Sequence, residues 1–230
     1  MCAAPTRCSP SNCEAKLGLV DLNAPHDRGA GQHHAEQARA GGWRARPSAV
    51  WSPAQQDWLT RGGSLTLHLQ ALGAVQIEVL SEGATAARGS DAHCLRARIG
   101  APIWLREVVL RVDGRACVAA HSVTPLHASR GAWRAMRGLH TRPLGSLLYH
   151  DRSVTRSALV SRRVMGGDPL YALAGRASVQ NTADPAGTRN LAQLERALPA
   201  RRSVFMRRGQ PLLVVECLLP SLWSLLSGVD

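Results

Sequence analysis

Apolar segments separated by tight turn signals dominate the second half of the chain. Residues 103–126 contain two such segments on either side of an Asp-Gly pair at 113–114, which is typical of a two-residue hairpin turn. Residues 201–220 repeat this arrangement around an Arg-Gly pair at 208–209. The pattern therefore predicts two β-hairpins.

Further strands and short helices are expected between and before the hairpins. Alternating apolar residues over 74–83 predict a strand, and residues 153–164 predict another. Ser52 followed by Pro53 marks the start of a helix, and a second helix is expected from Ser64 to Gly73. Shorter helical segments are expected at 132–136, after the Pro-Leu-Gly turn at 143–145, and after the Asp-Pro pair at 168–169.

The order of these elements indicates the fold class. Strands and helices do not alternate as a parallel sheet requires, so we predict an α+β domain with an antiparallel sheet of about six strands flanked by helices. Residues 1–46 are rich in Ala, Gly, Pro, His and Arg without periodicity, and we expect a disordered leader there. Residues 47–230 would form the single domain, with an insertion at about 166–197.

The chain is strongly basic, with 28 Lys and Arg against 16 Asp and Glu and a net charge of +12. Such a balance raises the question of a nucleic-acid partner. Lys16 is the only lysine, however, and the arginines are scattered among apolar residues instead of forming a run. We therefore expect no nucleic-acid partner, although a basic surface attracts anionic substrates.

The cysteines and the apolar runs indicate whether the protein binds a metal and where in the cell it is found. The six cysteines show no zinc-ligand spacing, so no metal is expected. The N-terminal segment lacks the apolar core of a signal peptide, and the apolar run near the C-terminus is short and interrupted by Pro220. We expect a cytoplasmic protein without stable membrane insertion.

Two predicted strands carry a charge among apolar residues. Arg106 lies within WLREVVL and Glu216 within LLVVECLLP, and a charge in such surroundings is costly unless something pairs with it. If both side chains face one cavity, they would suit a small molecule that carries a carboxylate and a hydroxyl. The alternatives are a buried ion pair between Arg106 and Glu216, or a pair between Arg106 and its neighbour Glu107.

Four segments occur in an order that matches a known family. The segments are DWLTRGGSLT, WLREVVLRVDGRACVAAHSVTP, TRPLGSLLYH and ARRSVFMRRGQPLLVVECLLP. They resemble the corresponding segments of bacterial chorismate lyases, the enzymes that make 4-hydroxybenzoate for ubiquinone, over roughly Trp51 to Trp223. The resemblance implies a single α+β domain with an antiparallel sheet that encloses its ligand in a pocket under flap-like segments.

The resemblance also implies roles for individual residues. Arg106 would hold the ring carboxylate, the backbone N–H of Leu144 would make a second contact to it, and Glu216 would meet the ring hydroxyl. A further cation is expected at the second carboxylate of the substrate. Arg201 or Arg202 would supply it, unless both are surface charges at the start of a strand.

The implied reaction is the loss of pyruvate from chorismate, which gives 4-hydroxybenzoate as the first committed step of ubiquinone biosynthesis. The family implies a carbon–oxygen lyase without cofactor, a monomer, and a transient hand-off of the product to a membrane prenyltransferase. The alternative is a non-catalytic, effector-sensing domain of similar fold that binds small anions. Such domains usually follow a DNA-reading helix-turn-helix, and residues 1–46 show no such pattern.

The chain departs from the family pattern at three places. Pro199 stands where a Trp is common, Arg61 replaces a usual acidic residue, and His121-Ser122 replaces an Arg-Thr pair. These positions lie outside the three expected ligand contacts. We therefore expect them to affect the packing and closure of the pocket and not the class of reaction.

Overall fold

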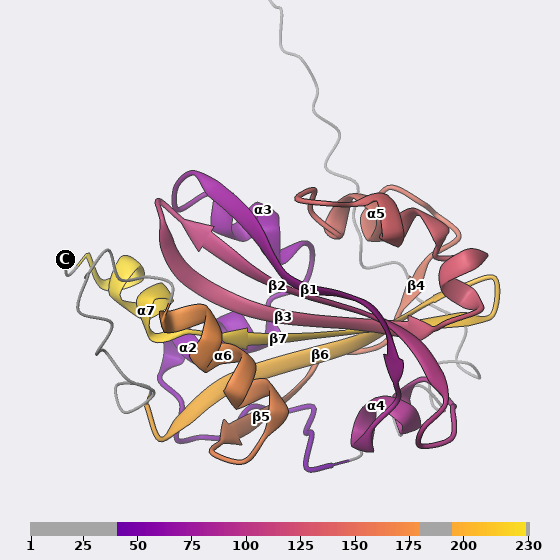
Figure 1. The fold of residues 1–230 in the computed structure, drawn as a ribbon. Coiled ribbons are helices and arrows are strands. Elements are labelled where there is room, and N and C mark those ends of the chain that lie inside the picture. The colour runs from indigo at the N-terminus through magenta and orange to yellow at the C-terminus, as the bar shows by residue number, and fades with distance from the viewer. Residues whose placement is uncertain (1–40, 180–194, 229–230) are drawn as a thin grey trace, which may run out of the picture.

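The computed structural model describes residues 41–179 and 195–228, which form one antiparallel sheet covered by helices (Figure 1). The strand order is β1-β2-β3-β7-β6-β4, and β5 also pairs with β6. The α+β class is confirmed. The seven strands are β1 (Val75–Ala86), β2 (Pro102–Val112), β3 (Arg115–Pro125), β4 (Thr155–Arg156), β5 (Val160–Met165), β6 (Ala197–Arg207) and β7 (Gln210–Leu218).

Both predicted hairpins are confirmed, as β2–β3 and β6–β7. Asp113 and Gly114 have φ values of 48° and 81°, and Arg208 and Gly209 have φ values of 50° and 72°. Two successive residues with positive φ give the turn a twist that matches that of the strands. The Asp113 side chain also accepts a hydrogen bond from the backbone of Ala74 at 2.9 Å, which ties this turn to the start of β1.

The segment 153–164 forms two short strands, whereas one was predicted. β4 pairs with β6 at Phe205 and Met206, and β5 pairs with the first half of β6. Between them, Ser157 hydrogen-bonds the backbone of Val204 through both its N–H and its hydroxyl group, which interrupts the regular ladder. This break brings Arg156 to the end of a strand of two residues.

The helices are short. α2 (Pro53–Thr60) begins as predicted, because Ser52 and Gln55 form a reciprocal capping box. Residues 134–138 form a 3₁₀-helix, η2 (Arg134–Gly138), and α4 and α7 were not predicted. The remaining helices are α3 (Leu65–Gln70), α4 (Gly89–Cys94), α5 (Gly145–Tyr149), α6 (Pro169–Val179), α7 (Pro220–Ser227) and η1 (Ala128–Arg130). Within the described ranges, none of the helices is long and apolar enough to cross a bilayer.

The two faces of the sheet pack against different helices (Figure 1). On one face, the apolar side chains of β2 and β7 pack with α2, α3, α5 and α7 in two adjoining clusters. On the other face, the alternate residues of the same strands pack with α4 and α6. Strand alternation therefore assigns neighbouring residues of the sequence to separate environments.

The first described residues already belong to the core. Trp43 is 3% exposed and packs on the α6 face, and the backbone N–H of Arg44 donates to the Ser161 carbonyl at 2.9 Å. These two residues fall within the range expected to be a leader, of which residues 1–40 lie outside the described part. The expected insertion at 166–197 begins with α6, and its residues 180–194 are likewise outside the described part.

Candidate active site

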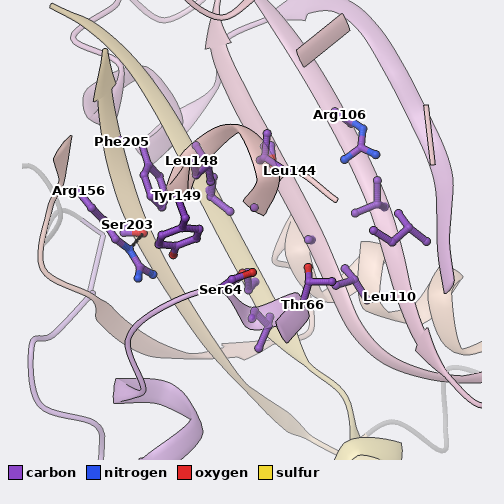
Figure 2. A pocket seen from close by; sticks show the side chains of 18 residues that line it. Ser64, Thr66, Arg106, Leu110, Leu144, Leu148, Tyr149, Arg156, Ser203 and Phe205 are labelled. Carbon is purple, nitrogen blue, oxygen red and sulfur yellow. Dashed lines mark hydrogen bonds between the residues drawn. The ribbon is translucent and has the colours of Figure 1, made fainter. Parts of the chain in front are cut away.

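A pocket lies between the sheet and the segments that contain α3 and α5 (Figure 2). The empty space between its lining atoms, with its mouth included, is about 560 Å³. Its walls combine apolar side chains with a few polar groups, as is usual for small-molecule sites. The lining includes Arg106, Val108 and Leu110 of β2, Ala120 and Ser122 of β3, Val214 and Glu216 of β7, Ser203 and Phe205 of β6, Arg156 of β4, Ser64, Leu65 and Thr66 at the start of α3, and Leu144, Gly145, Leu148 and Tyr149 around α5.

Arg106 is a buried cation without a carboxylate partner among the described residues. The side chain is 2% exposed, and its Nη2 donates to the backbone carbonyls of His140 at 2.7 Å and Arg142 at 3.4 Å. Its Nε is buried and has no hydrogen-bond partner in the described structure. A guanidinium held by carbonyls in this way keeps donors for an incoming anion.

The surroundings of Arg106 explain why its charge is costly. Burial lowers the pKa of Arg106, and the nearby Glu82 carboxylate acts in the opposite direction. Glu82 is the register partner of Arg106 across β1 and β2, but the two side chains form no ion pair in the described structure. His140, whose carbonyl holds Arg106, has a φ of 48°, an uncommon conformation for a residue other than glycine.

Leu144 stands where the chain enters α5 and lines the pocket. Within the described residues, its backbone N–H donates no hydrogen bond. Arg106 and Leu144 therefore both present unused donors, and Figure 2 shows both among the residues that line the pocket.

Glu216 lies in the same pocket as Arg106 but is not paired with it. The two residues sit two strands apart and two residues out of line, roughly 12 Å between Cα atoms at standard strand spacings. The Glu216 Oε2 atom accepts a hydrogen bond of 2.6 Å from Arg201 Nε, and Arg201 is its register partner on β6. No described residue hydrogen-bonds the other oxygen, Oε1, so this atom is available to a ligand.

Comparison with known proteins gives the family. The family model described as "Chorismate lyase" matches residues 40–227. The chain belongs to the chorismate lyase family. A probable chorismate pyruvate-lyase from Bordetella avium is 46% identical over 80% of this chain and 86% of its own length. A protein of the same name from Bordetella pertussis is 46% identical over 81% of this chain and 92% of its own length.

Two further relatives are more distant. A probable chorismate pyruvate-lyase 1 from Pseudomonas entomophila is 38% identical over 80% of this chain and 92% of its own length. Among solved structures, that of PhnF from Mycobacterium smegmatis is similar with a TM-score of 0.48 and 17% identity, over 70% of this chain and 65% of that chain.

The structure changes one expectation about the second cation. Arg201 and Arg202 are 0% and 1% exposed, so neither is a surface charge at the start of a strand. Arg201 is engaged by Glu216 and by the carbonyls of Trp58 and Arg61. Arg202 points to the opposite face of the sheet, where its guanidinium lies 4.4 Å from the centre of the Trp43 ring.

Arg156 is a pocket residue that we did not predict from the sequence. It lines the wall beside Tyr149 and Phe205, on the side away from Arg106 in Figure 2. Its Nε donates to the Ser203 hydroxyl at 2.9 Å, and its Nη1 lies 3.4 Å from the Gly63 carbonyl. No signal in the sequence marks this residue, because 153–164 was expected to be one continuous strand in which Arg156 has no distinguishing feature.

Among the departures from the family pattern, Arg61, His121 and Pro199 lie outside the lining of this pocket, whereas Ser122 is part of it. Arg61 forms an ion pair with Asp57 at the end of α2 and stacks over Trp58 at 4.8 Å. His121 faces the opposite side of the sheet, and Pro199 is a buried residue of β6 opposite β5. Their positions agree with effects on packing.

The pocket offers no obvious arrangement for a resident metal. Among residues 41–179 and 195–228, no three or more His, Cys, Asp or Glu side chains are grouped so that they could hold an ion. The charged groups that line the pocket are the buried guanidinium of Arg106, the Glu216 carboxylate and the guanidinium of Arg156 beside aromatic rings.

Proposed function

We propose that the protein is a chorismate pyruvate-lyase that converts chorismate into 4-hydroxybenzoate and pyruvate. The names of its relatives support this activity. The observation that carries the proposal is the buried Arg106 guanidinium, which lines the pocket without a carboxylate partner among the described residues. A buried charge of this kind is costly until an anion binds, so an anionic substrate supplies what the fold leaves out.

The reaction needs neither an oxidant nor a reductant. The carbon that bears the ring hydroxyl loses its proton, and this electron pair completes the aromatic ring. The carbon–oxygen bond to the enolpyruvyl group on the adjacent carbon breaks, and the departing enolate takes up a proton to become pyruvate. The gain in aromaticity drives the elimination, so the protein has to orient the ring and stabilise charge.

The pocket supplies groups for both ends of this ring. Arg106 and the Leu144 N–H bind the ring carboxylate. Glu216 Oε1 accepts a hydrogen bond from the ring hydroxyl group, while Arg201 donates to Oε2 and holds the carboxylate in place. Glu216 is thereby positioned to assist the movement of the proton from the carbon that bears this hydroxyl group.

We further propose that the product enters ubiquinone biosynthesis, where this reaction is the first committed step, and passes to a membrane prenyltransferase. A cytoplasmic monomer without a cofactor is sufficient for that role, because the substrate and the product are small anions that dissolve in water. The competing proposal is an effector-sensing domain, which would bind such anions without changing them.

An ultraviolet assay separates these two functions. Purified protein is mixed with chorismate in the presence of a chelator, and the appearance of 4-hydroxybenzoate and pyruvate is followed. We expect catalytic turnover at a rate proportional to the protein concentration. Binding of 4-hydroxybenzoate without any turnover would instead favour the effector-sensing domain.

A further inference from the structure

Arg156 is a second cation of the pocket whose charge no described carboxylate neutralises by an ion pair. The hydrogen-bond partners of its guanidinium are a hydroxyl group, Ser203 Oγ, and a backbone carbonyl, that of Gly63. The guanidinium carbon also lies 5.2 Å from the centre of the Phe205 ring and 5.9 Å from that of Tyr149. Neutral oxygens and ring faces orient a guanidinium without cancelling its charge.

The position of Arg156 is as informative as its charge. Its strand pairs with β6 at Phe205, and β6 in turn pairs with β7, which carries Glu216. Arg156 and Glu216 interact electrostatically, whereas Arg106 lies on the opposite side of the pocket (Figure 2). One end of the pocket thus has a single cation, and the other end has a carboxylate and a cation near each other.

This distribution matches the substituents of chorismate. The ring carboxylate lies at one end of the ring, and the hydroxyl and the enolpyruvyl ether lie on adjacent carbons at the other end. When Arg106 holds the ring carboxylate and Glu216 meets the hydroxyl, the carboxylate of the enolpyruvyl group must lie on the side of Glu216. A guanidinium on that side can bind it with charge-assisted hydrogen bonds.

We propose that Arg156 binds the enolpyruvyl carboxylate and thereby makes the pocket selective for the substrate over the aromatic product. The inference rests on the proposed lyase function. Arg156 replaces Arg201 and Arg202 in the role expected from the sequence, because Arg201 is held by Glu216 and does not line the pocket, and Arg202 packs on Trp43 at the opposite face. Burial lowers the pKa of Arg156, so its charge, like that of Arg106, is costly in the empty pocket.

The proposal assigns different consequences to the two guanidinium groups. The ring carboxylate is present in both chorismate and 4-hydroxybenzoate, so Arg106 serves both ligands. The second carboxylate leaves with pyruvate, so Arg156 serves only the substrate. A measurement that compares the two ligands therefore separates the role of Arg156 from a general effect on the pocket.

The test uses Arg156→Met, with Arg152→Met as the matched control. Both changes remove one positive charge, but Arg152 is exposed and outside the pocket lining. For Arg156→Met we expect kcat/KM for chorismate to fall about 10- to 100-fold, as for the loss of a charge-assisted hydrogen bond. The Kd for 4-hydroxybenzoate should change less than about threefold, and Arg152→Met should match the wild type on both measures.

Equal losses for chorismate and 4-hydroxybenzoate would overturn the proposal, because they would show a structural role for Arg156. An unchanged kcat/KM would overturn it as well. If Arg156→Met does not fold by circular dichroism, Arg156→Lys decides instead, since it retains the charge but loses the planar fork, and the same selective loss on chorismate is expected at several-fold. A wild type without lyase activity would refute the proposed function itself, a result distinct from these.

Discussion

Arg106 and Glu107 are neighbours in the sequence, but β2 directs them to opposite faces of the sheet. On the α6 face, Glu107 accepts a hydrogen bond of 2.7 Å from Arg176 and lies 3.8 Å from His121 Nδ1. His121 Nε2 in turn lies 2.8 Å from Asp91. On the α5 face, Arg106 has only backbone carbonyls as partners in the described structure.

Both faces are hollowed, so the presence of a cavity does not separate them. Several charges in the cavity on the α6 face form ion pairs within the fold, including Glu107 with Arg176 and Arg162 with Asp168. The pocket on the α5 face contains Arg106 and Arg156, which form no ion pair with described residues. The comparison is consistent with the proposal that ion pairs on the first face stabilise the fold and that Arg106 and Arg156 on the second face bind a ligand.

The strongest test of this difference between the two faces is Arg106→Ala. We expect kcat/KM for chorismate and the affinity for 4-hydroxybenzoate to fall together, because a desolvated charge-assisted contact is worth roughly 1.5–3 kcal/mol or more. The melting temperature should change little, since an unpaired buried charge contributes little to stability. Steady-state kinetics and calorimetric titration measure the loss, and wild-type kinetics in this variant would exclude the anchoring role.

Glu107→Gln is the counterpart on the other face. It should lower the free energy of unfolding by about 1–2 kcal/mol, because it removes the negative charge opposite His121 and Arg176 in a partly buried site. The kinetics of the folded variant should stay within about twofold of the wild type, since Glu107 does not line the pocket. Urea unfolding and kinetics on one preparation would show whether stability and turnover change separately. A large loss of turnover would argue against a purely structural role for Glu107.

Glu216 is intermediate between these two charges, since Arg201 holds one of its oxygens and the other is free. In Glu216→Gln, the contact to the ring hydroxyl changes from a charged to a neutral one. We expect the binding free energy for 4-hydroxybenzoate to weaken by about 1 kcal/mol, so that its Kd rises roughly fivefold. The loss of stability should be smaller. If the melting curve collapses while the ligand still binds, the pair with Arg201 is structural and the ligand role is refuted.

The comparison also shows what could be predicted from the sequence. Strand alternation left open whether Arg106 and Glu216 share a cavity, and the structure places both in the lining of one pocket. The two turn pairs predicted the hairpins that carry them. Arg156 was not predicted as a pocket residue, because its strand of two residues ends at a break at Ser157. That break depends on a hydrogen bond to β6. The pairing of Glu216 with Arg201 could not be predicted, because the register between strands determines which residues pair and the local sequence pattern does not.

The pH dependence of stability should come from the α6 face. Burial lowers the pKa of His121, but hydrogen bonds and charge from Asp91 and Glu107 outweigh this and raise it from 6.5 to about 9. A folded-state pKa above the unfolded value stabilises the protein fully below pH 6.5, and this contribution is lost as the pH rises through about 9. The side chain is 20% exposed, so screening by solvent reduces the effect.

Unfolding by urea at several pH values between 6.5 and 9 tests this assignment. The free energy of unfolding should fall across that range in the wild type and change less in His121→Gln, which cannot become charged. Equal slopes in the two proteins would show that another group titrates. The kcat/KM at a fixed pH should be similar in both, because His121 lies on the face opposite the pocket.

The smallest effect is expected where the two segments over the pocket touch. A Cβ atom added at Gly145, at the start of α5, would lie 2.7 Å from the hydroxyl oxygen of Ser64, at the start of α3. The Ser64 hydroxyl makes no capping bond and can rotate away, so Gly145→Ala should cost less than about 1 kcal/mol of stability. It should nevertheless change KM for chorismate several-fold, because both residues line the pocket.

Two further variants make this effect interpretable. Gly138→Ala is the control, since an added Cβ at that position meets no atom within 4 Å and Gly138 lies outside the pocket lining. Ser64→Ala removes the hydroxyl that the new methyl group would meet, so the double variant should return to the KM of Ser64→Ala alone. A double variant whose effects simply add would mean that the two segments do not press on each other. Binding of chorismate would then depend on the charged groups of the pocket and not on the contact between Gly145 and Ser64.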